Sequence, residues 1–358
     1  MVPSPPDPEC RVIGPVRRAV SAWCVVTALA LSVVGPCALV AAGDDGPPRS
    51  FPTGRPTRTV LRPTEIVDLV PAKPSEKTVV MLVSGIGSDA PDATYDAIVA
   101  ALVNDPRYEI HRFGGDRVHP YDTLGGLDAN ADQLTAEIRE LAKTHPKIDI
   151  VAHSMGGAVA DAAFRRGLSG SDKVATYIAL AAPHDGSTLA KIGQPFLAAS
   201  DLLGARAEFR AISAALAQDI GSRAVQDLAT IHAGPPPQGV TRLDLRMGTD
   251  AIVTAPDAWT PNVMSRTLLP TTIPSIEGHG GVTTDPHAIA IITSTVAADR
   301  PPARGWRDAI LELAARSVSV VIDRHVPVLY CALGVLVLGC AVGLSLYRRR
   351  RWLPVGSP

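Results

Sequence analysis

The fold of this chain is most clearly indicated by one stretch, Ile148-Asp149-Ile150-Val151-Ala152-His153-Ser154-Met155-Gly156-Gly157. A β-branched, apolar run ends in Ala-x-Ser-x-Gly, and a sequence rich in small residues follows. This order predicts a strand, a sharp turn and a helix, with Ser154 at the turn as in a nucleophile elbow. Small residues two positions before and after Ser154 let the turn close without a Cβ clash, and the helix N-terminus favours an oxyanion. The alternative is a buried serine in a Gly-rich turn.

Strand-like and helix-like segments alternate on both sides of this elbow. Alternation of this kind predicts an α/β fold with a mostly parallel sheet covered by helices on both faces. A continuous apolar run such as residues 78–83 is typical of a strand buried on both sides. Strands are expected over 78–83, 108–113, 148–153, 173–181, 241–246 and 272–276, and helices over 91–103, 129–143, 155–168 and 285–297.

Residues 187–239 break the alternation with several short helical patterns before Pro235-Pro236-Pro237. An insert after a core strand lies over the carboxyl ends of the sheet, where a helical cap or lid would cover an active site. Ordinary packing of these helices on the sheet is the alternative.

A serine hydroxyl needs a base, and the base needs an orienting acid. In this fold the partners follow in the order serine, Asp or Glu, histidine. Asp250 is the expected acid because it follows the 241–246 strand in a Gly-x-Asp loop; a turn-capping aspartate is the alternative. Asp244, inside the strand, and Asp257, after a proline, are its competitors.

His279 is the expected base, since glycines on both sides suit a loop that brings an imidazole to the serine. His287 competes with it, but falls in the following helix. His153 is expected to be structural or to line the substrate site. The N–H groups of Met155 and Ile86 are the expected oxyanion-hole donors. No metal-ligand spacing and no nucleotide-binding motif occurs, so no cofactor and no metal are expected.

Two long uncharged segments predict membrane attachment. Residues 19–42 follow Arg17 and Arg18 and read equally as a signal peptide or an uncleaved signal anchor. Residues 326–347 are long enough to cross a bilayer and precede four arginines, which should stay in the cytoplasm. The cell membrane is therefore the expected location, with the catalytic domain extracytoplasmic and the C-terminal tail cytoplasmic.

These features divide the chain into seven expected parts. The central part is an α/β domain over 77–300, with the helical insert inside it. Around it lie a cytoplasmic tail (1–18), the signal or anchor segment (19–42), a Pro-rich linker (43–76), a juxtamembrane amphipathic helix (301–325), a transmembrane helix (326–347) and a basic cytoplasmic tail (348–358).

The overall charge and the cysteines narrow the functional classes. The formal net charge of −1 gives no reason to expect a nucleic-acid partner. All five cysteines lie at positions 10, 24, 37, 331 and 340, so the central domain is expected to have no disulfide.

Five blocks in order resemble the bacterial lipases of the α/β-hydrolase superfamily and the glycosylphosphatidylinositol inositol-deacylase-like group. The resemblance implies that Ser154 is the nucleophile, Asp250 the acid and His279 the base. One departure is Ser84-Gly85, where such lipases usually have His-Gly. The blocks are residues 83–87, 152–157, 181–187, 248–253 and 278–281.

Together these observations predict a membrane-anchored serine hydrolase of the lipase or esterase kind, acting on a lipid or other carboxylic ester. An acyltransferase, or a phospholipid or glycosylphosphatidylinositol deacylase, would use the same triad. A non-catalytic membrane protein that keeps the fold for binding is the alternative from another class.

Overall fold

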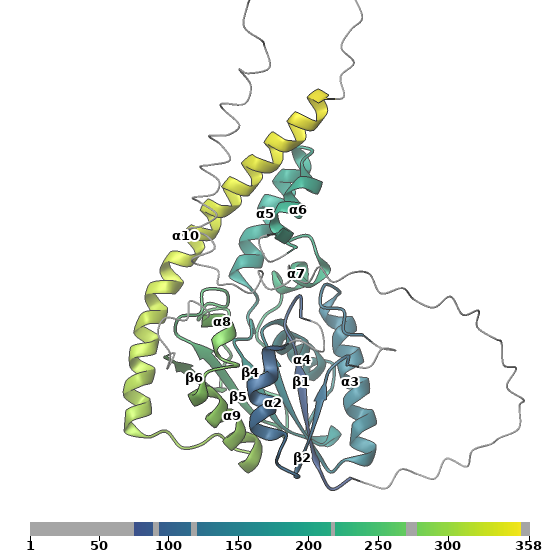
Figure 1. Cartoon of the computed structure of the whole chain (residues 1–358), viewed down its shortest axis with the longest axis vertical. Helices are drawn as coiled ribbons and strands as arrows, with labels where there is room; N and C mark the ends of the chain where they lie inside the picture. Colours follow the sequence, from purple (N-terminus) through teal and green to yellow (C-terminus); the bar gives the residue numbers. More distant parts are fainter. Residues whose placement is uncertain (1–74, 89–92, 116–119, 216–218, 270–277, 352–358) are drawn as a thin grey trace, which may run out of the picture. The chain divides into compact units, whose positions relative to one another are not determined.

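The computed structural model describes residues 75–88, 93–115, 120–215, 219–269 and 278–351. Three expected features lie outside these residues: the segments at 1–74, the strand at 272–276 and the end of the basic tail at 352–358. Six parallel strands form one sheet in the order β2-β1-β3-β4-β5-β6 (Figure 1). The strands are β1 (Thr78–Val83), β2 (Tyr108–Arg112), β3 (Lys147–His153), β4 (Val174–Leu180), β5 (Thr241–Met247) and β6 (Met264–Leu268).

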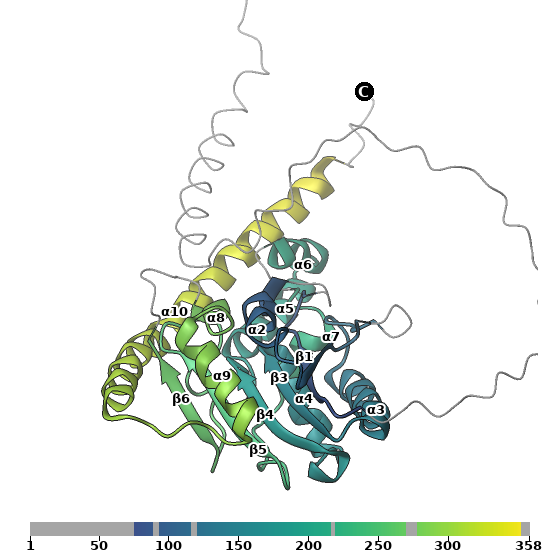
Figure 2. The ribbon, with the colours of Figure 1, turned by 60° about the horizontal axis from the view of Figure 1, so that its bottom comes forward.

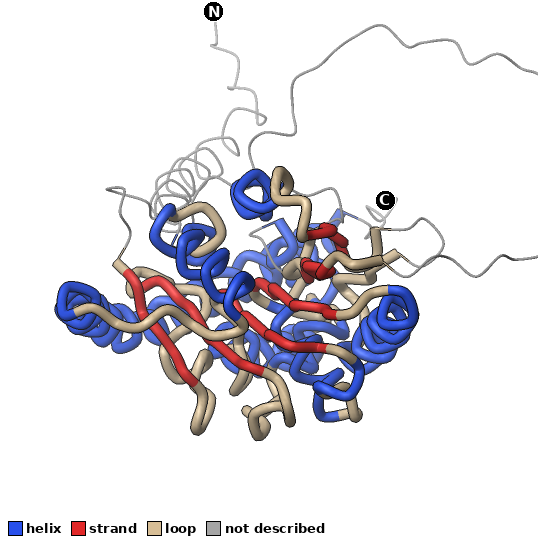
Figure 3. The backbone as a smooth tube through the Cα atoms, turned by 90° about the horizontal axis from the view of Figure 1, so that it is seen from below, coloured by secondary structure: helices blue, strands red, loops and turns tan. Residues whose placement is uncertain are grey.

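Helices cover both faces of the sheet (Figures 2 and 3). Val79 and Met81 of β1 pack into one core with α3 (Leu127–Thr144) and α4 (Met155–Arg165). Their neighbours in β1 pack into a second core with α2 (Asp96–Leu102) and α9 (Pro286–Ala298). Alternate side chains of β1 are thus buried on opposite faces, which explains its continuous apolar sequence. The expected α/β class and helix placement are confirmed.

The parallel register brings three loops to one edge of the sheet. Strand β3 pairs with β1 on one side and with β4 on the other, and β5 follows β4. The loops after β1, β3 and β5 therefore leave the same edge, where parallel α/β sheets place their binding sites. These loops carry Ile86, Ser154 and Asp250.

Strand β6 was not expected from the sequence. It pairs with β5 from Leu243↔Met264 to Met247↔Leu268 at the edge of the sheet. Its sequence, Met-Ser-Arg-Thr-Leu, is buried only at Arg266 and Leu268. A short edge strand with a polar sequence gives little periodic signal.

The insert contains α5 (Thr188–Leu202), α6 (Arg206–Ala215) and α7 (Arg223–Leu228). The chain then returns through β5, β6 and α8 (Gly278–Gly281) to α9. Last comes α10 (Trp306–Arg351), one continuous helix that spans both the expected juxtamembrane and transmembrane segments. Helices α5 and α6 both pack against α10 (Figure 1).

Candidate active site

Ser154 occupies the sharp turn between β3 and α4. Its backbone has φ 55° and ψ −129°, a region that non-glycine residues rarely adopt. The turn is fixed by backbone hydrogen bonds: Ser154 N–H donates to the Leu180 carbonyl at 2.8 Å, and Gly157 N–H donates to the Ser154 carbonyl at 2.9 Å. The strained conformation is typical of a serine at a nucleophile elbow.

Two glycines let α4 begin directly behind this serine. A Cβ on Gly156 would lie 2.2 Å from the Val83 carbonyl oxygen, and a Cβ on Gly157 would lie 2.3 Å from the Ala182 Cβ. The helix therefore packs against the ends of β1 and β4 at a separation that no side chain permits. This packing puts the N-terminus of α4 beside the serine hydroxyl.

His279 of α8 links Ser154 to Asp250. Its Nε2 lies 2.9 Å from Ser154 Oγ, and its Nδ1 lies 3.0 Å from Asp250 Oδ2. An ionised carboxylate can only accept, so Nδ1–H donates to Asp250 and Nε2 accepts from the serine hydroxyl. This arrangement can take the hydroxyl proton as the oxygen attacks an electrophile.

Asp250 is fully buried, and its second oxygen is also satisfied. Oδ1 accepts the backbone N–H groups of Ile252 and Val253, both at 2.9 Å. Burial raises the pKa of this carboxyl. The positive charge on His279 and the hydrogen bonds from His279, Val253 and Ile252 lower the pKa by more than burial raises it, so the pKa is below its usual value. The carboxylate is therefore ionised and oriented at neutral pH.

The competing acids have other partners. Asp244 pairs with Arg242, with Oδ1 2.9 Å from Nε. Asp257 accepts the backbone N–H of Thr188 at 3.0 Å and its hydroxyl at 2.8 Å, which ties the loop after β5 to the start of α5. Neither carboxylate takes the position beside His279.

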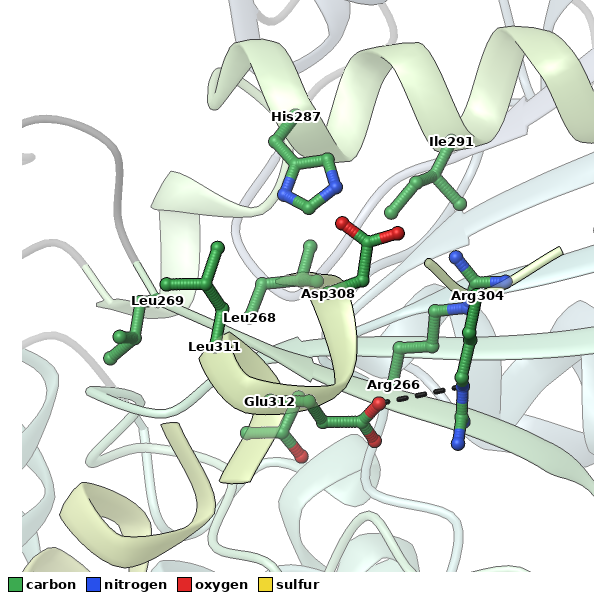
Figure 4. A pocket seen from close by; sticks show the side chains of 10 residues that line it. Arg266, Leu268, Leu269, His287, Ile291, Arg304, Asp308, Leu311 and Glu312 are labelled. Atoms are coloured by element: carbon green, nitrogen blue, oxygen red, sulfur yellow. Dashed lines mark ion pairs between the residues drawn. The ribbon is translucent and has the colours of Figure 1, made fainter. Parts of the chain in front are cut away.

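The competing histidines are also separate from the proton path. His287 lines a cavity of about 210 Å³ between β6, α9 and α10, together with Arg266 and Arg304 (Figure 4). His153 donates through Nε2 to the His279 carbonyl at 3.1 Å, and the two rings lie 4.9 Å apart. His153 thus supports the peptide of His279, in agreement with the structural role expected for it.

The loop after β1 approaches the serine closely. A Cβ on Gly85 would lie 2.9 Å from Ser154 Cβ, so only glycine fits there. Ile86 follows in this loop, and Met155 is the first residue of α4, whose N–H has no acceptor within the helix. Both expected oxyanion donors thus belong to segments that border the hydroxyl.

Two residues that the sequence reading missed hold this loop. The Tyr121 hydroxyl donates to the Ser84 carbonyl at 3.2 Å, and Gly87 N–H donates to Thr123 Oγ1 at 3.1 Å. Both hydrogen bonds fix the loop that contains Ser84 and Gly85. No motif marks these two residues, because they lie in an irregular segment, 37 and 36 residues beyond their partners in the loop.

The parallel sheet, the elbow and the hydrogen-bonded Ser–His–Asp arrangement define the α/β-hydrolase fold. A family model described as a PGAP1-like alpha/beta domain matches residues 130–197, which include Ser154. The expected resemblance to the glycosylphosphatidylinositol inositol-deacylase-like group is therefore confirmed over residues 130–197. Within the described ranges, no group of three or more His, Cys, Asp or Glu side chains could hold a metal ion.

Solved structures give further similarities. The chain is similar to lipase B of Aspergillus fumigatus, with 14% sequence identity, a TM-score of 0.43 and coverage of 74% of this chain and 62% of that one. It thus spans less than two thirds of that lipase. An esterase of Thermogutta terrifontis (17%, TM-score 0.42, coverage 63% and 92%) and the type II thioesterase BorB of the borrelidin biosynthetic cluster (22%, 0.40, 62% and 93%) are also similar. No curated protein matches the sequence.

Proposed function

We propose that this protein is a membrane-anchored serine hydrolase that cleaves a carboxylic ester, with Ser154, His279 and Asp250 as its catalytic triad. The observation that carries the proposal is the continuous hydrogen-bonded path from Ser154 Oγ through His279 to Asp250. A strained backbone at Ser154 and a buried Asp250 support it, because features that cost stability in this way cluster at active sites.

The mechanism follows from these positions. His279 Nε2 takes the hydroxyl proton as Ser154 Oγ attacks the ester carbonyl, and Asp250 stabilises the imidazolium that forms. The N–H groups of Met155 and Ile86 donate hydrogen bonds to the oxyanion. His279 returns the proton to the leaving alcohol, and water activated by the same histidine then releases the acid from the acyl-serine.

A lipid ester is the proposed substrate class. The most apolar stretch of α10 has a mean hydropathy of 2.3 and is only 17% buried, so this helix could span a membrane. Arginines 348–351 at its end favour a cytoplasmic C-terminus and an extracytoplasmic catalytic domain. An enzyme fixed to the bilayer meets lipid esters at high local concentration.

An acyltransferase, or a phospholipid or glycosylphosphatidylinositol deacylase, would use the same residues. The match to the PGAP1-like alpha/beta domain favours keeping the deacylase as the second candidate. A hydrolase passes the acyl group to water and an acyltransferase passes it to an alcohol, so hydrolysis and transfer assays on one lipid substrate distinguish these two activities. A deacylase differs in the alcohol that leaves, which a comparison of lipid substrates identifies.

Fluorophosphonate labelling of the full-length protein in detergent tests the proposal. We expect covalent labelling of wild type at Ser154, its loss in Ser154→Ala and in His279→Ala, and its retention in Ser171→Ala, a serine far from the site in the turn before β4. Wild type that is folded and yet unlabelled would favour the non-catalytic binding protein instead.

A further inference from the structure

One face of α10 lies against the loop that carries Asp250. We call residues 248–257 the acid loop. The residues of α10 that contact this loop or the end of β5 are Ala315, Ser319, Asp323 and Tyr330. Their spacings of four, four and seven residues put them on one side of the helix. The helix expected to be a membrane anchor thus also borders the active site.

The contact begins where β5 ends. A Cβ on Gly248 would lie 2.4 Å from the Ala315 carbonyl oxygen, so the loop and the helix backbone are closely packed. The buried Arg246 donates from Nη2 to Ser319 Oγ at 2.9 Å, and Ser319 donates to Asp323 Oδ2 at 2.8 Å. Asp323 also lies 4.0 Å from the Arg246 guanidinium. This polar cluster fixes α10 to the end of the strand.

Two hydrogen bonds then hold the acid loop itself. The Tyr330 hydroxyl donates to the Ala251 carbonyl at 2.6 Å, and Asp323 Oδ1 accepts the Ala255 N–H at 3.0 Å. Ala251 directly follows Asp250, and the donors to Asp250 Oδ1 come from the next two residues. The carboxylate and its braces therefore move as one unit, whose outer side is held by α10.

From this geometry we infer that α10 positions the catalytic acid, with Tyr330 and Asp323 as positioning residues that act through the acid loop. The inference rests on the proposed function, in which Asp250 orients His279. Releasing the loop allows Asp250 to drift from His279 Nδ1, and a small misplacement of a catalytic group slows the chemical step.

If residues 326–347 cross the membrane, the hydrogen bond of Tyr330 also sets the height of the site above the bilayer. Tyr330 lies four residues into the expected span, about 6 Å along the helix from its start. A hydrogen bond at this depth places the acid loop at the lipid–water boundary, where tyrosine is favoured. Lipid esters would then be within reach of Ser154 without leaving the bilayer surface.

The test compares Tyr330→Phe with Tyr347→Phe in the full-length protein in detergent. Tyr347→Phe removes the same hydroxyl about 26 Å further along α10, away from the acid loop. Labelling with a small fluorophosphonate gives two values, the fraction of sites labelled at the endpoint and the second-order rate constant. For Tyr330→Phe we expect an unchanged endpoint and a rate constant about three- to tenfold lower, as for one lost hydrogen bond. Misfolding would lower the endpoint instead.

A second pair of variants and a second readout sharpen the test. Asp323→Ala should lower the rate constant as Tyr330→Phe does, whereas Asp323→Asn keeps an acceptor for Ala255 N–H and should restore most of it. Hydrogen–deuterium exchange of the amides of residues 251–255 should be faster in Tyr330→Phe and unchanged in Tyr347→Phe. Unchanged exchange and labelling rate in Tyr330→Phe would overturn the inference alone. Absence of labelling in folded wild type would instead overturn the proposed function.

Discussion

Gly85 lies against Ser154 in the loop after β1, which we call the oxyanion loop: a Cβ on Gly85 would lie 2.9 Å from Ser154 Cβ and 3.3 Å from Oγ. Contacts below 3.0 Å force one partner to move. The loop after β1 thus reaches its position only because residue 85 has no side chain, and Ile86, the expected oxyanion donor, is the next residue in this loop.

Gly85→Ala should therefore reduce turnover by about 100-fold or more, the size of losing one oxyanion donor. The control is Gly87→Ala in the same loop. Gly87 has φ +72° and nothing within 4 Å of a Cβ, so alanine there strains the backbone without touching Ser154. We expect Gly87→Ala to lose about 1 kcal/mol of stability and to keep activity within tenfold. Ester hydrolysis and thermal unfolding of both variants check this; equal losses of activity would contradict it.

Tyr121→Phe tests the support of the oxyanion loop. It removes the hydrogen bond to the Ser84 carbonyl but keeps the ring, which packs 4.8 Å from that of Phe113. We expect kcat to fall about threefold to tenfold with KM unchanged, because the displaced donor would bind the oxyanion only in the transition state. Thr123→Val, which removes the acceptor for Gly87 N–H, should act in the same direction. A change confined to KM would assign Tyr121 to substrate binding.

The elbow and its partners could be predicted because their residue types are constrained locally. Ser154 lies between small residues that its backbone requires, and Asp250 and His279 follow in Gly-containing segments in the order the fold demands. The loop expected at His279 is the short helix α8 in the structure. The contacts of Tyr121 and Tyr330 could not be predicted. Each joins segments far apart in the sequence, 37 and 79 residues respectively, and depends on how these segments pack in three dimensions.

The packing partner of the helical insert could not be predicted from the sequence either. The short helices over 187–239 were expected from their periodicity, but the partner of their apolar faces was not. A Cβ on Gly334 would lie 2.3 Å from the Phe196 ring, so α5 packs directly on α10. A hydrophobic face indicates that a helix is covered, not by which element.

Asp149→Asn should stabilise the protein near neutral pH. Asp149 is fully buried in β3, with Oδ2 3.2 Å from Lys147 Nζ. Burial raises its pKa from 3.8 to about 6, although Lys147 opposes the rise. Because the folded state holds this proton more tightly than the unfolded state, the contribution of Asp149 to stability falls as pH rises from about 4 to about 6 and is then constant.

Asparagine removes that loss, so the variant should exceed wild type by up to about 3 kcal/mol at pH 7.5, from about 1.4 kcal/mol per pKa unit. The difference should shrink towards pH 4. Lys147 keeps a second partner, Asp299, in the variant. Urea unfolding at pH 4 and pH 7.5 measures both differences; a variant less stable than wild type at pH 7.5 would show that the ion pair with Lys147 outweighs burial.

The C-terminal end of α10 contacts the helical insert. Ser345 donates to the Gly204 carbonyl at 3.0 Å, and Arg348 pairs with Glu208 of α6 at 3.1 Å. These contacts put the turn between α5 and α6 at the end of α10 that the expected span places across the bilayer. Charged residues of α6 such as Arg206 and Glu208 would cost about 2.5–3.5 kcal/mol each in hydrocarbon.

If residues 326–347 cross the membrane, α6 must therefore separate from the end of α10. We expect spin labels at Glu208→Cys and Arg348→Cys, in a chain with its five natural cysteines replaced by serine, to be far apart in lipid nanodiscs. A control pair at Arg139→Cys and Asp172→Cys should stay close, because these two residues form an ion pair with each other inside the sheet domain. Double electron–electron resonance measures both distances between the spin labels. A short distance between positions 208 and 348 in nanodiscs would mean that α10 remains packed on the insert and that residues 326–347 do not cross the bilayer.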